Sequence, residues 1–168
     1  NAQRYNSRYT PMYLVEVNNT KQEKIFLDLP DKIYASDNQW VKPLNQDIEK
    51  VFDLKKNKLF TRKGKAIRWN LFNANNEPIG RIAAFVNPTY EGKQPVGGIG
   101  FFECINDQLA ANYMFDESKK WLESHGMQTM DGPINFGERD QWWGLLVEGF
   151  HEPLYCMNYN PEYYINLF

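Results

Sequence analysis

The chain has 168 residues, which fits one domain and is long enough to bury roughly 70% of its unfolded surface. Hydrophobic residues make up 42% and charged residues 24%, a composition that excludes a disordered chain. The formal net charge of -2 gives no reason, over the whole chain, to expect nucleic acid or an anionic membrane as a partner. No apolar run in the sequence comes close to about 18 residues, the length that a membrane-spanning helix needs.

The two ends of the sequence lead to expectations about the domain limits. Residues Asn1 and Ala2 resemble the scar left by removal of a purification tag. We expect residues 3–168 to form a single domain, and the apolar end at Phe168 favours a domain truncated at its C-terminus. With only two cysteines and no disulfide framework, a reducing cytoplasm is the simplest compartment.

The first third of the chain predicts a strand and two helices. Residues 13–17 read as a short strand, and Asn19 or Thr20 can cap the helix that follows. Pro30 falls inside that helical pattern, so we expect it to kink or interrupt the helix. A second, short helix is predicted over residues 47–52.

A basic segment follows, with no acidic residue in it. Such a run is more often a solvated linker than a binding site for an acidic partner. Its cations are Lys55, Lys56, Lys58, Arg62, Lys63 and Lys65.

The middle of the chain predicts an antiparallel hairpin followed by a glycine-rich strand. Residues 66–73 and 78–86 read as paired strands, and Asn75-Asn76 supplies the turn between them. Residues 97–105 read as a third strand, whose glycines indicate a bulge or a close approach of another backbone.

The next segment predicts a strand-helix-strand crossover. A helix over 107–125 is capped by Asn106 or Asp107 and ends at Gly126, and residues 127–130 read as a strand. A crossover of this length indicates a parallel, right-handed pair of strands. Further on, we expect an apolar helix over 142–147 and a final helix that opens at Asn160-Pro161.

Two polar residues are candidates for chemistry. Glu103 interrupts the apolar 97–105 strand near its carboxyl end, where ligands of open α/β sheets bind. Among aromatic neighbours its pKa can be raised so that it acts as a base, or it can face solvent or pair with a lysine or arginine. Asn135 lies in a turn that could orient a ligand, although a plain structural turn is the commoner outcome.

The histidines and cysteines point to no site of their own. His125 at a helix end and His151 in a loop lack the neighbouring ligands that a metal site needs, so we expect no metal. Cys104 lies on an apolar strand, where burial is the default. The sequence contains no Walker, nucleophile-elbow or dinucleotide-binding glycine pattern.

Several motifs together carry a resemblance to a known superfamily. They are Gly100-Phe101-Phe102-Glu103-Cys104, Asp131-Gly132-Pro133-Ile134-Asn135-Phe136, the segment 144–150, and Asn160-Pro161 with Tyr163-Tyr164, supported upstream by segments 37–44 and 80–84. Over most of its length the chain resembles the GNAT (N-acetyltransferase-like, acyl-CoA N-acyltransferase) superfamily, in a branch found in bacterial proteins.

The resemblance implies an α/β (α+β) fold, a GNAT-like mixed sheet flanked by helices, with the C-terminal strands apparently missing. It also implies transfer of an acyl group from acetyl-CoA or another acyl-CoA to a small amine or peptide. Glu103 would accept the amine proton, and Tyr164 (or Tyr163) would protonate the leaving thiolate. In the superfamily pantetheine lies between two splayed strands, so the residues expected against it are Cys104, Ile105, Asn106 and Asn135.

One departure from the superfamily pattern concerns the cofactor. The superfamily grips pyrophosphate with a Gln/Arg-x-x-Gly-x-Gly/Ala turn, using backbone amides and the helix dipole. Residues 105–111 have no glycine there, and Asp107 puts negative charge where phosphate would sit. We therefore expect weak or no binding of acetyl-CoA, and we keep a non-catalytic GNAT-fold binding domain as the alternative function.

Two weaker expectations concern partners. Aminoacyl transfer from a charged tRNA is an alternative that only the basic segment supports, and nucleic acid is otherwise not expected. If the final strands are absent, an unpaired sheet edge and an apolar surface would favour a homodimer or domain swap. The residues expected on that surface are Trp142, Trp143, Tyr163, Tyr164 and Phe168.

Overall fold

The computed structural model describes residues 3–5, 11–88, 94–136, 144–154 and 157–168. These residues form a six-stranded sheet in which the strands are ordered as in the chain. Every neighbouring pair is antiparallel except β5 and β6, which are parallel. The strands are β1 (Gln3–Tyr5), β2 (Met12–Glu16), β3 (Lys65–Phe72), β4 (Pro78–Val86), β5 (Val96–Cys104) and β6 (Thr129–Asp131).

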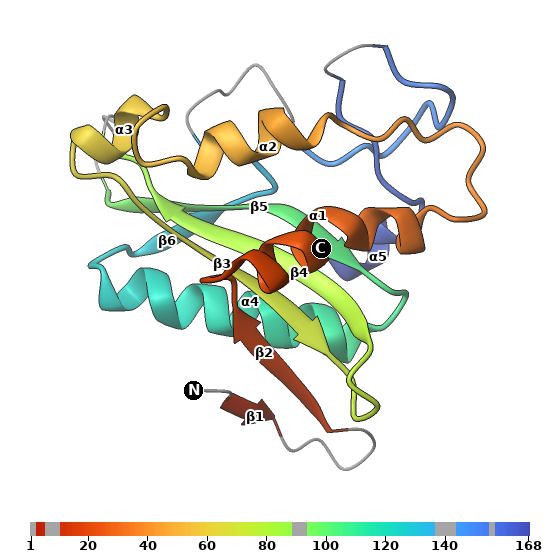
Figure 1. Cartoon of the computed structure of the whole chain (residues 1–168), viewed down its shortest axis with the longest axis horizontal. Coiled ribbons are helices and arrows are strands. Elements are labelled where there is room, and N and C mark those ends of the chain that lie inside the picture. The colour runs from red at the N-terminus through yellow and green to blue at the C-terminus, as the bar shows by residue number, and fades with distance from the viewer. Residues whose placement is uncertain (1–2, 6–10, 89–93, 137–143, 155–156) are drawn as a thin grey trace.

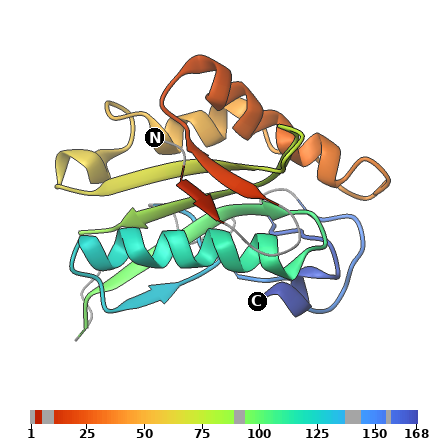
Figure 2. The same ribbon diagram turned by 90° about the horizontal axis from the view of Figure 1, so that it is seen from below.

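Helices cover both faces of this sheet (Figures 1 and 2). One face carries α1 (Thr20–Ile33), α2 (Asn45–Phe52) and the short α3 (Lys58–Thr61), and the other carries α4 (Gln108–Ser124). The last helix, α5 (Tyr164–Leu167), lies beside the start of α4 and is tied to it by a 3.1 Å hydrogen bond from the Gln108 side chain to the Leu167 carbonyl.

The predicted crossover is confirmed. Strand β5, helix α4 and strand β6 follow one another, and Val96 pairs with Thr129 in parallel register. Helix α4 buries Ala110, Met114 and Leu122 on one side, which packs against the sheet as the main core. The result is a mixed sheet flanked by helices, the α/β fold class that the sequence predicts.

Pro30 does not interrupt α1, contrary to the sequence prediction. A proline lacks the N–H that would bond to the carbonyl four residues earlier, here that of Phe26. The Phe26 carbonyl accepts a hydrogen bond from Nη1 of Arg81 on β4 instead. Because Pro30 lies in the last turn of α1 and its lost bond is replaced, the helix continues to Ile33.

The C-terminal segment differs from the prediction in two ways. Residues 144–147 are not helical, and the rest of the predicted 142–147 helix lies outside the described residues. The last helix begins at Tyr164 rather than at Asn160. The reason is that the Asn160 side chain bonds to both backbone groups of Leu146, at 2.8 Å and 3.2 Å, and so holds two loops together instead of capping a helix.

The expected apolar surface is also corrected at one residue. Tyr164 is only 2% exposed, because its ring packs edge-on against Phe102 with centroids 5.2 Å apart. Tyr163 is half-buried and Phe168 is 45% exposed, while residues 142 and 143 lie outside the described part of the chain. The homodimer or domain swap stays a prediction.

A bulge in β5 breaks the regular pairing of the sheet, as the glycine-rich sequence predicts. Arg81 pairs with Glu103 and Ala83 with Gly100, so two residues of β5 face one residue of β4. The first of the two, Phe101, has a φ of 53°, in the left-handed region. On the other side of β5, the Ile134 amide bonds to the Ile99 carbonyl at 2.8 Å, and no later backbone bond joins these segments in the described residues. The two segments therefore separate beyond this point.

The close approach that precedes the separation predicts a large effect of replacing Gly100. A Cβ atom there would lie 1.9 Å from the Ile134 carbonyl oxygen, a backbone atom that cannot turn aside. We expect Gly100→Ala to lower the free energy of unfolding by about 3 kcal/mol, measured by urea denaturation. Gly126→Ala is the control, because Gly126 has a φ of +82° but nothing within 4 Å, so only backbone strain of about 1 kcal/mol is expected. Equal losses in the two variants would contradict the close approach.

Candidate active site

A cavity of about 110 Å³ lies where β5 and the segment after β6 separate. Its walls come from α1, α2 and the connection between them, strands β4 and β5, segment 133–135, the loop residues 145, 153 and 157–160, and α5. Most of the lining is apolar or aromatic. The polar side chains that converge on it include Tyr34, Arg81, Glu103, Asn135 and Tyr164.

Glu103 lies at the centre of the polar part of the cavity. Its side chain is 13% exposed, and its Oε1 lies 3.5 Å from Nη2 of Arg81. Its Oε2 accepts a 2.8 Å hydrogen bond from the hydroxyl of Tyr164. Burial raises the pKa of Glu103, while the Arg81 charge and hydrogen bonds from Tyr164 and Tyr34 oppose the increase. Two alternatives that the sequence left open therefore hold together. Glu103 pairs with an arginine, and its pKa is nevertheless raised by burial in the wall of the cavity.

Arg81 is the buried cation that balances this carboxylate. It is 4% exposed, and its guanidinium lies over the Phe26 ring, 4.8 Å from the centroid. Burial lowers the pKa of Arg81, and the neighbouring charge of Glu103 opposes that decrease. Its Nε has no hydrogen-bond partner in the described residues. Removing either Arg81 or Glu103 would leave the other as an uncompensated buried charge.

The two tyrosines of the C-terminal segment bind the backbone at the end of β5. The Tyr164 hydroxyl accepts from the Cys104 amide at 2.8 Å while it donates to Glu103. The Tyr163 hydroxyl donates to the Cys104 carbonyl at 2.6 Å. Burial raises the pKa of both phenols, so both are neutral hydroxyls near neutral pH. Together they occupy the backbone groups that a ligand lying along this end of β5 would use.

Of the four residues predicted to lie against a cofactor, only Asn135 lines the cavity. Cys104 is fully buried, and Ile105 and Asn106 are exposed beyond the end of β5, so none of the three lines the cavity. Asn135 does line it, at 3% exposure, and neither atom of its side-chain amide has a partner in the described residues. A buried amide without partners is costly unless a ligand completes its hydrogen bonds.

The start of α4 is already capped from within the chain. The Asp107 carboxylate accepts from the amides of Leu109 and Ala110, at 2.8 Å and 3.2 Å. A helix N-terminus offers such amides to an anion, and here a carboxylate takes them. The cap predicted from the sequence is confirmed at Asp107, and it competes with any phosphate at this position.

Sequence reasoning missed two contributors to the site. Arg81 had a local signal of a special role, because it is a cation inside an otherwise apolar strand. The sequence did not predict, however, that both faces of this strand would be buried. Tyr34 follows the end of α1, where nothing local separates it from a surface tyrosine. In the structure it is 4% exposed and stacks on Trp40 at a centroid distance of 4.5 Å.

Neither a metal cluster nor a membrane-spanning helix is found in the described residues. They contain no group of three or more His, Cys, Asp or Glu side chains that could hold a metal ion. Nor does any helix in the described part of the chain have the length and apolar character needed to cross a membrane.

This geometry defines an α/β domain with a mostly apolar cavity that has a polar centre and lies beside the end of a parallel strand pair. Among curated proteins, the bacterial ceramide synthase of Caulobacter vibrioides is 27% identical over 165 residues. The match covers 95% of this chain but spans only 42% of that relative's length. No protein-family model matches the sequence.

Among solved structures, three similar chains carry acetyltransferase names. A putative acetyl transferase from Pyrococcus furiosus has a TM-score of 0.46 and 11% identity, over 76% of this chain and 85% of its own. The aminoglycoside acetyltransferase meta-AAC0020 from an uncultured soil metagenomic sample has a TM-score of 0.45 and 11% identity, over 74% of this chain and 78% of its own. The aminoglycoside antibiotic 6'-N-acetyltransferase AAC(6')-Ih from Acinetobacter baumannii has a TM-score of 0.44 and 13% identity, over 73% of this chain and 80% of its own. Similarity at this level does not bear on activity.

The arrangement around Glu103 predicts a measurable effect of the Tyr34 hydroxyl. Because that hydroxyl lowers the pKa of Glu103, we expect Tyr34→Phe to raise it. The measurement is a carbon-13 NMR titration of the Glu103 carboxyl. Tyr159→Phe is the matched control, since the Tyr159 hydroxyl donates to Asp37 at 2.7 Å and is not among the groups acting on Glu103. An unchanged Glu103 pKa in Tyr34→Phe would contradict this assignment.

Proposed function

We propose that this chain is an N-acyltransferase domain that moves a fatty acyl group from a thioester to a long-chain amine. The observation that carries the proposal is the cavity in which buried Glu103 is held between Arg81 and the hydroxyl of Tyr164. A carboxylate with a raised pKa beside a neutral hydroxyl is suited to removing one proton and delivering another. The relative named a ceramide synthase supports the choice of substrates, because a ceramide is an amide of a fatty acid and a long-chain amino alcohol.

The proposed reaction uses both groups in sequence. A primary amine is protonated near neutral pH, so it first releases one proton to solvent. The neutral nitrogen then attacks the thioester carbonyl; as the carbon–nitrogen bond forms, Glu103 accepts a second proton from the nitrogen, and the carbon–sulfur bond breaks. The thiolate takes a proton from the Tyr164 hydroxyl, which regains one from Glu103 across their 2.8 Å hydrogen bond. The proton that Glu103 accepts thus ends on the thiol.

The rest of the cavity supports a long-chain substrate. Apolar side chains from α1, α2 and the adjoining loops surround the polar groups, which suits a hydrocarbon chain better than a sugar or a charged peptide. They include Leu27, Val41, Ile48, Leu145 and Met157. Asn135 offers one donor and one acceptor group that an amide or hydroxyl of either substrate would satisfy.

The non-catalytic alternative keeps one specific observation in its favour. Asp107 occupies the amides at the start of α4, and Tyr163 and Tyr164 occupy the backbone of Cys104. A binding domain that no longer uses the diphosphate of acyl-CoA would have these features. The enzyme proposed here instead holds its thioester donor mainly through the acyl chain, in the apolar part of the cavity.

The catalytic proposal predicts loss of activity when Glu103 is neutral. We expect Glu103→Gln to reduce amide formation from palmitoyl-CoA and sphinganine at least about 100-fold, measured by mass spectrometry of the product. In the wild type the rate should rise with pH through the raised pKa of Glu103, because only the carboxylate accepts a proton. Glu77→Gln, an exposed carboxyl remote from the cavity, is the control.

Two outcomes would separate the alternatives. Because Glu103→Gln leaves Arg81 unpaired, Tyr164→Phe is made alongside it, which preserves both charges; we expect it to lower the rate as well. A folded Glu103→Gln chain with full activity would overturn the role of Glu103. A wild-type chain that binds the long-chain amine but forms no amide would favour the binding domain.

The cap at α4 gives a separate prediction about the donor. Asp107→Asn keeps a capping side chain but removes the negative charge, so we expect it to bind palmitoyl-CoA several-fold more tightly than the wild type. Asp116→Asn removes an equal charge from the exposed side of the same helix and should leave affinity unchanged. Isothermal calorimetry measures both, and equal affinities in all three chains would show that the diphosphate does not approach α4.

A further inference from the structure

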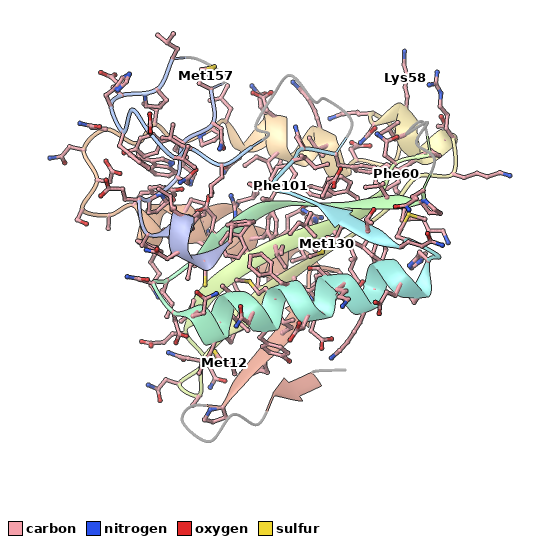
Figure 3. All side chains as sticks on the ribbon, turned by 180° about the vertical axis from the view of Figure 1, so that it is seen from behind. Met12, Lys58, Phe60, Phe101, Met130 and Met157 are labelled. Carbon is pink, nitrogen blue, oxygen red and sulfur yellow. The ribbon has the colours of Figure 1, made fainter. Side chains whose placement is uncertain are left out.

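Among the described residues, one side of the molecule carries most of the large apolar side chains that are exposed. We call it the α2–α3 face: helices α2 and α3, the connection 41–44, Leu54, segment 144–154 and Met157. Figure 1 shows these segments together along one side, and Figure 3 shows Lys58 and Met157 at the two ends of it. Its exposed apolar residues, each at least half accessible, are Val41, Leu44, Leu54, Val147, Leu154 and Met157. Burying such side chains in an apolar phase is favourable.

The same face is positively charged at its α3 end. From Leu54 to Lys65 the chain has six cations and no acid. All six are exposed, and Lys55, Lys58 and Arg62 have no ion-pair partner in the described residues. At the other end of the face, Glu148 and Glu152 are exposed beside the apolar loops. The charge is therefore polarised, although the whole chain is nearly neutral.

The cavity connects to this face. Val41 and Met157 line the cavity and are also 58% and 62% exposed, so the apolar lining continues onto the surface. An exposed leucine next to lysines, on the same face as the exposed apolar rim of the cavity, is a combination that fits a bilayer interface better than an acidic protein or a nucleic acid.

We propose that the α2–α3 face docks on an anionic lipid bilayer. Leu54 enters the interface, the lysines of the 55–63 segment contact lipid phosphates, and the cavity opens toward the membrane. Docking of this kind needs no membrane-spanning helix. It does not depend on the proposed catalysis, because the contacts lie outside the polar groups around Glu103.

Vesicle co-sedimentation without any substrate tests the docking. The probes are vesicles of phosphatidylcholine containing 30% phosphatidylglycerol, and vesicles of phosphatidylcholine alone. We expect the wild-type chain to bind the anionic vesicles at least tenfold more tightly, and to lose that advantage at high salt. Lys55→Glu/Lys58→Glu should lower the affinity for anionic vesicles at least tenfold.

Two matched variants distinguish docking through this face from general attraction between charges. Lys119→Glu/Lys120→Glu makes the same charge change on α4, across the sheet, and should retain most of the binding. Leu54→Ser changes no charge and should weaken binding to anionic vesicles while leaving binding to a polyanion such as tRNA unchanged. Tight binding to tRNA with none to anionic vesicles would overturn the proposal, as would equal losses in the two charge variants. Amide synthesis is not part of the measurement, so failure of the proposed function would leave these results interpretable.

Discussion

The buried ion pair between Arg81 and Glu103 is the interaction on which the rest of the site depends. It joins β4 to β5, and a further bond from Arg81 to the Phe26 carbonyl joins both strands to α1. That carbonyl is free because Pro30 has no N–H to offer it. The proline within the helix thus leaves the Phe26 carbonyl free to accept a hydrogen bond from the buried Arg81. Losing one partner of such a pair costs about 3 to 5 kcal/mol, so the site and the stability of the domain are coupled.

The bulge in β5 sets the register that places Glu103 opposite Arg81. The extra residue at Phe101 shifts the pairing, so that Glu103 remains opposite Arg81 while Gly100 stays in contact with Ile134. The strands close together on one side of the bulge and separate on the other. A cavity consequently forms directly beside the carboxylate, with the unpartnered amide of Asn135 in its wall.

Opposing effects act on the pKa of Glu103, the base in the proposed function. Burial alone would hold it protonated, and a strong ion pair alone would make it a poor proton acceptor. The structure applies both, with hydroxyls of Tyr34 and Tyr164 adding finer adjustment. At the end of β5 and the start of α4, by contrast, the chain satisfies its own backbone at Cys104, Leu109 and Ala110. In the proposed function, a thioester donor would therefore find these backbone groups already occupied.

The sequence by itself determined most of the elements from β2 to β6, although not α3, and the order in which they follow. Caps such as Asn19 and Asp107, the Asn75-Asn76 turn and the period of each segment are local signals, so the hairpin and the strand-helix-strand crossover could be predicted. Glu103 and Asn135 were also found, because a polar residue in an apolar strand or a turn after a strand is visible in one segment.

Only the tertiary structure decided what those residues contact. Arg81, Tyr34 and Tyr164 are all far from Glu103 in sequence, and no local pattern records that their side chains act on its carboxyl group. The same holds for Pro30, whose cost within α1 is offset by a side chain from a strand of the sheet. Buried polar groups must find partners wherever the fold places them, so the partner of a buried charge is set by long-range packing rather than by sequence period.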